Sequence, residues 1–77
     1  MVRGLLNWRA EDVMRFLKKY GFSNTHMRGS HMYYSCFYNG QERIVTIPFH
    51  KGDVINPKTL RSIIIQSGIP KEEWLDK

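Results

Sequence analysis

The stretch "HMYYSCFYNGQERIVTIP", residues 31–48, decides the fold. It contains two runs rich in tyrosine, phenylalanine, isoleucine, valine and threonine, which are typical of strands. Asn39-Gly40 lies between the runs, and it is a strong signal for a tight hairpin turn because both residues tolerate positive φ. The stretch therefore predicts two antiparallel strands, roughly over 30–38 and 42–48. Pro48 has no N–H to donate, so we expect it to end its strand or to lie at an edge.

A third strand precedes this hairpin. Residues 22–28 have the composition of a strand, and Arg28-Gly29 reads as a tight break before the next one. Along the middle strand, alternation places His31, Tyr33, Ser35 and Phe37 on one face, and Ser30, Met32, Tyr34, Cys36 and Tyr38 on the other. Both sets are partly apolar, so the sequence leaves open which face is covered.

Two helices flank the three strands. The apolar spacing predicts a helix over residues 8–19, with Asn7 as its N-cap and Gly21 as the residue that ends it. Asn56-Pro57 predicts the start of a second helix, which Gly68 and Pro70 stop, and the tail "KEEWLDK" can add one helical turn. The order α-β-β-β-α predicts an α+β fold, in which a three-stranded antiparallel sheet carries two helices on one face.

The length and composition exclude several classes of protein. We expect one domain over residues 1–77, with a small core. The single cysteine excludes a disulfide framework, and one cysteine with three histidines provides no zinc spacing, so no cofactor or metal is expected. The first residues, "MVRGLLNWR", contain no apolar run long enough for a signal peptide, and no stretch can span a membrane. We therefore expect a cytoplasmic protein.

A histidine stands at the head of the middle strand, in the tripeptide Gly29-Ser30-His31. An imidazole can take and give a proton near neutral pH, which makes His31 a candidate for acid–base chemistry. Gly29 lets a ligand backbone approach closely, and Ser30 adds a hydroxyl. From the residues alone, a single strand histidine is more often structural than catalytic, and both interpretations stay open.

The remaining candidates each have a more ordinary interpretation. His26 is expected to be a solvated strand residue and His50 a loop residue, although His50 in "PFHKGD" could reach a phosphate. Cys36 is expected in the core because nothing near it in the sequence activates its thiol. The aromatic cluster could stack nucleobases on an open sheet face or form core and cross-strand pairs. Its members are Tyr33, Tyr34, Phe37 and Tyr38.

Basic residues bracket the strand ends and the second helix. The formal net charge is +5, from 12 lysines and arginines against 7 acidic residues. Such an excess is typical of polyanion binders, but it also occurs in proteins with a merely solvated basic rim. The residues in question are Arg28, Arg43, Lys51, Lys58 and Arg61.

Three segments resemble the HicA family of bacterial toxins, and the resemblance covers residues 11–70. They are "FLKKYGF", "RGSHMYY" and "IVTIPFHKGDVINPKTLRSIIIQSGI". The marker of the family is Gly-Ser-His at the head of a strand, here Gly29-Ser30-His31, and the resemblance implies that His31 is the catalytic histidine. Many members have a second histidine directly after the first, where this chain has Met32.

The resemblance also implies a fold, an activity and partners. HicA toxins resemble double-stranded-RNA-binding domains (dsRBDs) in fold, cleave mRNA and are neutralised by a HicB antitoxin. The expected partners are therefore mRNA and a HicB-type antitoxin in the bacterial cytoplasm, with no membrane and no DNA contact by the toxin alone. The residues expected to hold the substrate are Arg28, Gly29, Ser30, Lys51, Lys58 and Arg61.

RNA carries its own nucleophile, the 2′-hydroxyl, so cleavage requires neither a protein nucleophile nor a metal ion. We therefore expect a metal-independent endoribonuclease in which His31 is the base or the acid, complemented by a lysine, a tyrosine or water. The alternative is a non-catalytic RNA-binding module of the same fold, in which His31 only contacts a phosphate or a 2′-hydroxyl.

Overall fold

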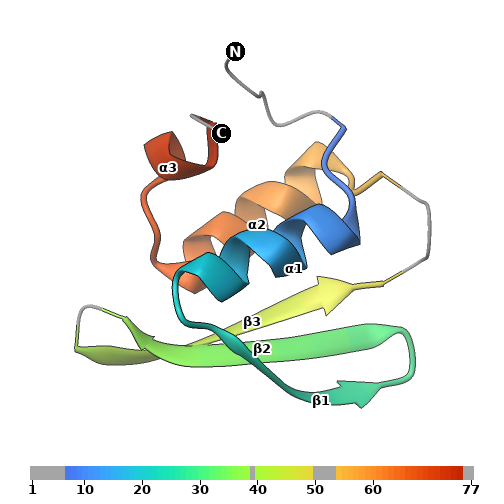
Figure 1. Ribbon diagram of the computed structural model, residues 1–77. Helices are drawn as coiled ribbons and strands as arrows, with labels where there is room; N and C mark the ends of the chain where they lie inside the picture. Colours follow the sequence, from blue (N-terminus) through green and yellow to red (C-terminus); the bar gives the residue numbers. More distant parts are fainter. Residues whose placement is uncertain (1–6, 39, 50–53, 76–77) are drawn as a thin grey trace.

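The computed structural model of the chain describes residues 7–38, 40–49 and 54–75. The three strands form one antiparallel sheet in the order β1-β2-β3. Figure 1 shows α1 and α2 side by side over one face of this sheet, with no described element over the other. The predicted α+β fold is thus confirmed. The elements are α1 (Ala10–Lys19), β1 (Ser23–Arg28), β2 (His31–Tyr38), β3 (Gln41–Pro48), α2 (Pro57–Ser67) and α3 (Lys71–Leu75).

The hairpin of β2 and β3 has the predicted form. The two strands pair without interruption from His31 opposite Pro48 to Tyr38 opposite Gln41. Gly40 has a φ of 78°, as a tight turn requires, while Asn39 lies outside the described residues. Both strands begin and end within one residue of their predicted bounds, and Pro48 ends β3 as expected.

One face of β2 packs on the helices, and this resolves the ambiguity that the sequence left open. Tyr34 is buried, as are Val45 and Ile47 on β3, while Met32 and Cys36 pack against the same core. The other side chains of β2 point away from the helices. We call this second surface the open face of the sheet; it carries His31, Tyr33, Ser35 and Phe37 of β2.

Strand β1 contains a bulge that the sequence did not reveal. Asn24 lies opposite Tyr34, but the next paired residue is His26, opposite Tyr33, so Thr25 is an extra residue in the ladder. A bulge changes which face the side chains beyond it occupy. His26 lies on the open face with Tyr33, in the register that the turn to β2 sets, and the bulge shifts the pairing of the residues before it, Asn24 and Ser23.

Helix α1 begins later than predicted, and Asn7 is not its N-cap. Asn7 has a φ of 68°, and the N-cap is Arg9, whose backbone N–H donates to Asp12 Oδ2 at 2.9 Å. The reason is tertiary: the carbonyl of Trp8 accepts a hydrogen bond of 2.6 Å from the Ile55 N–H. This pairing keeps the backbone extended up to Arg9 and delays the first helical turn.

The other helix signals are confirmed. The Asn56 side chain accepts a hydrogen bond of 2.8 Å from the Lys58 N–H, and Pro57 is the first residue of α2. Gly68 ends α2 in the left-handed conformation with a φ of 76°, and Gly21 follows α1 with a φ of 90°. These ends depend on local backbone chemistry, which explains why the sequence predicts them well.

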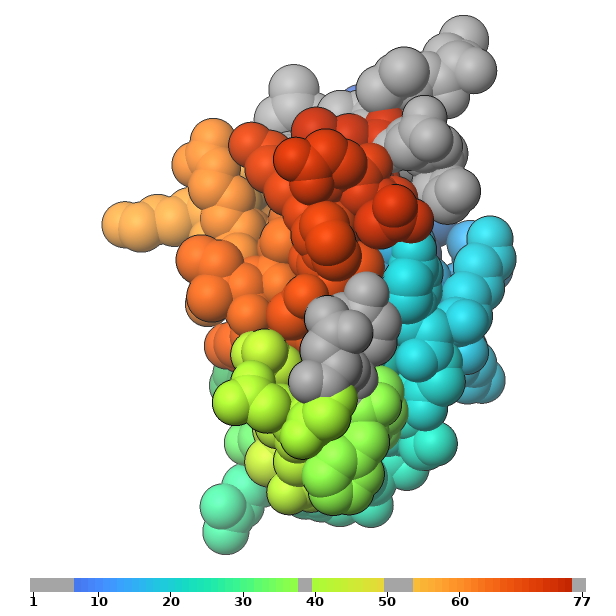
Figure 2. All heavy atoms as spheres, turned by 90° about the vertical axis from the view of Figure 1, so that its left-hand side faces the viewer, coloured from blue at the N-terminus to red at the C-terminus, as the bar shows by residue number. Residues whose placement is uncertain are grey.

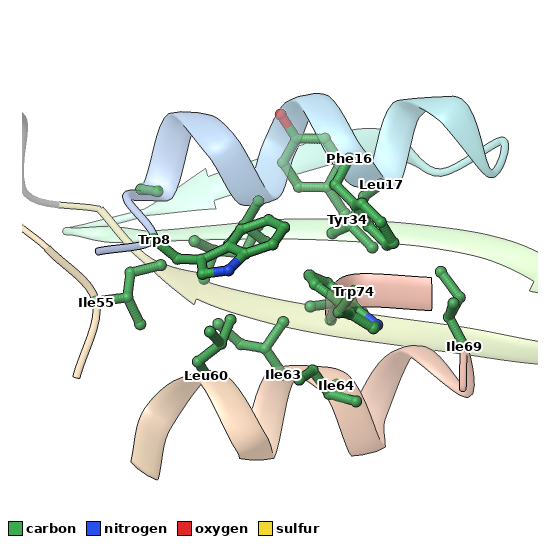
Figure 3. Close-up of a cluster of buried hydrophobic side chains, with 14 of the residues drawn as sticks. Trp8, Phe16, Leu17, Tyr34, Ile55, Leu60, Ile63, Ile64, Ile69 and Trp74 are labelled. Carbon is green, nitrogen blue, oxygen red and sulfur yellow. The ribbon is translucent and has the colours of Figure 1, made fainter. Parts of the chain in front are cut away.

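The core between the helices is built around aromatic rings. Trp74 of α3 stacks on Phe16 of α1, with ring centroids 4.1 Å apart, and lies 5.5 Å from Trp8. Figure 3 shows Trp74 between α1 and α2, and Figure 2 shows α3 between the ends of these helices. The Tyr20 hydroxyl donates to Glu73 at 2.6 Å. The predicted C-terminal turn thus exists, and it completes the core.

The outer edge of β3 is tied to α2. The Thr46 N–H, which points away from β2, donates to the side-chain oxygen of Gln66 at 2.9 Å. The backbone of β3 therefore has one of its outward donors satisfied by a helix side chain. This bond fixes α2 beside the strand that ends opposite His31.

Candidate nucleic-acid interface and catalytic histidine

His31 is the first residue of β2 and lies on the open face. Its neighbours across the sheet are Arg28 on β1 and Pro48 on β3. The side chain is exposed, and it makes no hydrogen bond or ion pair with any residue that the structure describes. The imidazole is therefore accessible to a ligand and held on a strand that is paired on both sides.

The turn before His31 consists of Gly29 and Ser30. Gly29 has a φ of 58°, a backbone conformation that residues other than glycine rarely adopt. A Cβ placed there would meet no atom within 4 Å. The Ser30 carbonyl accepts a hydrogen bond of 2.6 Å from the Phe49 N–H. The turn is thus open to solvent on one side and anchored to the end of β3 on the other.

A second imidazole lies on the same face as His31. The ring of His26 stacks on that of Tyr33, with centroids 4.3 Å apart and planes 9° from parallel. The Thr25 hydroxyl lies 3.3 Å from His26 Nδ1 and donates to the Tyr33 carbonyl at 3.2 Å. These two residues were not paired from the sequence, although the register counted back from the turn at Gly29-Ser30 places His26 opposite Tyr33.

The predicted basic residues fall into separate groups. Arg28 lies directly opposite His31. Lys58 is in the first turn of α2, at the end of the molecule where β3 finishes (Figure 1). Arg61 lines a small hollow of about 200 Å³ beside Ile64, Ile65 and Lys71. Lys51 and His50 lie outside the described residues. The structure thus brings Arg28, Gly29 and Ser30 to His31, and leaves Lys58 and Arg61 on the neighbouring helix.

Arg43 is not part of the open face. It lies opposite Cys36, is only partly exposed, and a Cβ added at Gly68 would lie 2.8 Å from its Nε. Its guanidinium thus lies against the C-terminal end of α2, where the helix dipole favours a positive charge. The arginine is better explained by this contact than by binding of phosphate.

Tyr34 and Cys36 lie on the covered face. Burial raises the pKa of the Tyr34 phenol, although a hydrogen bond with Asn24 opposes the shift. Burial also raises the pKa of the Cys36 thiol. A thiol with a raised pKa stays protonated at neutral pH, so it is a poor nucleophile. The predicted core role of Cys36 is confirmed.

Among the described residues, no three side chains of histidine, cysteine, aspartate or glutamate lie close enough to share a metal ion. None of the helices in the described part of the chain has the length and apolar character needed to cross a bilayer.

The chain matches the family model described as HicA toxin of bacterial toxin–antitoxin over residues 10–69. It belongs to the HicA toxin family. It is therefore a toxin of a toxin–antitoxin system, and such a toxin has an antitoxin as its partner. Neither the curated proteins nor the solved structures contain a match to this chain. The family match ends before α3, so the helix that carries Trp74 lies beyond it.

Proposed function

We propose that this HicA toxin is an endoribonuclease that cleaves mRNA with His31 as its catalytic histidine and without a metal ion. The observation that carries the proposal is the position of His31, exposed and without a partner among the described residues, at the start of a strand paired on both sides. A structural histidine would be buried or hydrogen-bonded. An exposed imidazole on a strand that is paired on both sides is suited to meeting a substrate.

The proposed chemistry uses the substrate's own hydroxyl. The 2′-oxygen of one ribose forms a bond to the adjacent phosphorus, and the bond from phosphorus to the 5′-oxygen of the next nucleotide breaks. One group must take the proton of the 2′-hydroxyl, and one must give a proton to the leaving 5′-oxygen. His31 performs one of these transfers. Arg28, directly across the strand pair, is placed to neutralise the phosphate.

The proposed partners follow from the same site. The substrate is mRNA, and DNA is not cleaved because it lacks the 2′-hydroxyl. A HicB-type antitoxin would inhibit the toxin by covering the open face around His31. The proposed setting is the bacterial cytoplasm, where mRNA is found.

The proposal predicts cleavage without divalent ions. Purified protein incubated with single-stranded RNA in excess chelator and monovalent salt should shorten the RNA, because no step needs a metal. A DNA strand of the same sequence should stay intact. If cleavage appeared only after magnesium or manganese was added, the mechanism would be wrong. If RNA bound but was never cut, the alternative of a non-catalytic RNA-binding module would replace the proposal.

A second prediction concerns the substrate-binding residues, for which Lys51, Lys58 and Arg61 are proposed together with Arg28, Gly29 and Ser30. Changing both Lys58 and Arg61 to glutamate should weaken RNA binding across all sequences. The slope of log affinity against log salt should fall by about 1 for each lost phosphate contact. Fluorescence anisotropy at several salt concentrations measures both quantities.

Arg15→Glu is the matched control for this charge reversal. Arg15 is an exposed residue on α1 that pairs with Asp12 at 3.3 Å, and it is not one of the proposed contacts. Its reversal should leave the salt slope unchanged. Equal effects of the control and the double variant would show that only net charge matters.

A further inference from the structure

We infer that the stacked rings of His26 and Tyr33 form a binding platform for an unpaired nucleobase next to the cleaved phosphate. This inference deepens the proposed function, because it states that the substrate is single-stranded RNA and names the residues that hold a base.

The pair of rings lies next to His31 on the open face. The register places Tyr33 two residues after His31 on the same face, and places His26 opposite Tyr33. In an antiparallel pair, diagonal neighbours such as His26 and His31 are about 7–8 Å apart. One bound nucleotide can therefore contact both residues. A nucleobase stacked on the pair would therefore bring its own phosphate close to His31 and Arg28.

The hydrophobic core does not require the platform. The aromatic rings that stabilise the fold, such as Trp74 and Phe16, lie between the helices. His26 is exposed, and it lies on the open face because it pairs with Tyr33 in the register that the turn at Gly29-Ser30 sets. Bulges often re-aim a side chain next to a functional site. Here the bulged residue, Thr25, lies beside the pair, and its hydroxyl contacts both His26 Nδ1 and the Tyr33 carbonyl.

The platform is already ordered before any ligand binds. The rings are nearly parallel, and the Thr25 hydroxyl contacts both His26 Nδ1 and the Tyr33 carbonyl. A pre-ordered pair loses little conformational entropy when a base extends the stack. Bases stack on aromatic side chains with little sequence preference, because every base has a π-face.

The charges on the open face indicate which end the RNA occupies. Arg28 lies at the His31 end, whereas Glu42 lies opposite the exposed Phe37 at the other end of β2. A carboxylate repels phosphates, so Phe37 is not expected to be part of the platform although its side chain is 78% exposed. A base in a duplex is covered on both faces by its neighbours, so only an unpaired base can use the rings.

The test measures binding separately from cleavage. The probe is a short RNA with a 2′-O-methyl group at every ribose, so that it cannot be cut, offered single-stranded or as a duplex of the same sequence. We expect tighter binding of the single strand. Tyr33→Leu and His26→Leu should each weaken it about 5- to 100-fold, the range for loss of one base stack. Tyr33→Phe and His26→Phe keep flat rings and should retain affinity, and Phe37→Leu is the matched control.

Three results would overturn the inference. One is equal affinity for duplex and single strand, and another is Tyr33→Leu and His26→Leu binding like the wild type. The third is unchanged RNA affinity in these variants together with weaker binding of the antitoxin, which would make the rings a protein-docking surface. Circular dichroism identifies a variant that fails to fold. If Tyr33→Leu is unfolded, the test relies on His26→Leu, because His26 is exposed. In all three cases, cleavage of ordinary RNA by the wild type would leave the proposed function standing.

Discussion

Replacing His31 with glutamine is expected to lower the rate of RNA cleavage by roughly 10²–10⁴-fold, the usual contribution of a general acid or base. Glutamine keeps a similar size and can hydrogen-bond, but it cannot transfer a proton near neutral pH. Binding should persist, because affinity depends mainly on charged and aromatic residues. Single-turnover cleavage at saturating RNA measures the rate, and anisotropy measures the affinity.

Ser35→Ala is the matched control for His31→Gln. Ser35 lies on the same strand and the same face as His31 but outside the proposed site, so its loss should leave both rate and affinity unchanged. The thermal midpoint of His31→Gln should also match that of the wild type, because an exposed position costs little stability when changed. Near wild-type cleavage by His31→Gln would mean that another group carries the proton.

Replacing Trp74 with alanine is expected to lower the free energy of unfolding by about 3–5 kcal/mol, as for other buried tryptophans. Trp74 is fully buried and contacts rings from α1 and from the segment before it. A loss of this size is a large share of the stability of a small domain, so much of the protein should be unfolded at 37 °C. Urea denaturation, monitored by circular dichroism, measures the free energy of unfolding.

Two further variants sharpen this prediction. Ile65 lies on α2 with its side chain 75% exposed, so Ile65→Ala should change stability by less than about 0.5 kcal/mol. Trp74→Phe should cost less than Trp74→Ala, because a ring remains to stack, and the Trp74 Nε1 has no acceptor among the described residues. If Trp74→Ala were as mild as Ile65→Ala, α3 would not belong to the folding unit.

The sequence predicted those parts of the fold that depend on local chemistry. The hairpin around Gly40, the Asn56 cap and the glycine stops all follow from the backbone preferences of a few adjacent residues. Asn7 failed as a cap because Trp8 pairs with Ile55, a residue far along the chain. A local rule cannot anticipate a partner that folding brings from a distance.

The sequence predicted only the part of the candidate site that lies in a recognisable motif. The tripeptide Gly29-Ser30-His31 was identified as a sequence motif. The structure adds that Arg28 lies opposite the histidine. The stacked pair of His26 and Tyr33 was missed because it depends on the cross-strand register, which strand composition and alternation along one strand do not specify. The role of Trp74 was missed for another reason: a short tail after a proline gives no sign of what it packs against.

The bond between Gln66 and the backbone of Thr46 also limits how the protein can self-associate. A chain that adds copies at both edges of its sheet can grow into a fibre, but a chain with one usable edge can at most form a closed pair. A strand arriving at β3 would have to displace the Gln66 side chain from the Thr46 N–H. The remaining edge, β1, is distorted at Thr25. Growth of the sheet by addition of further strands is therefore disfavoured at both edges.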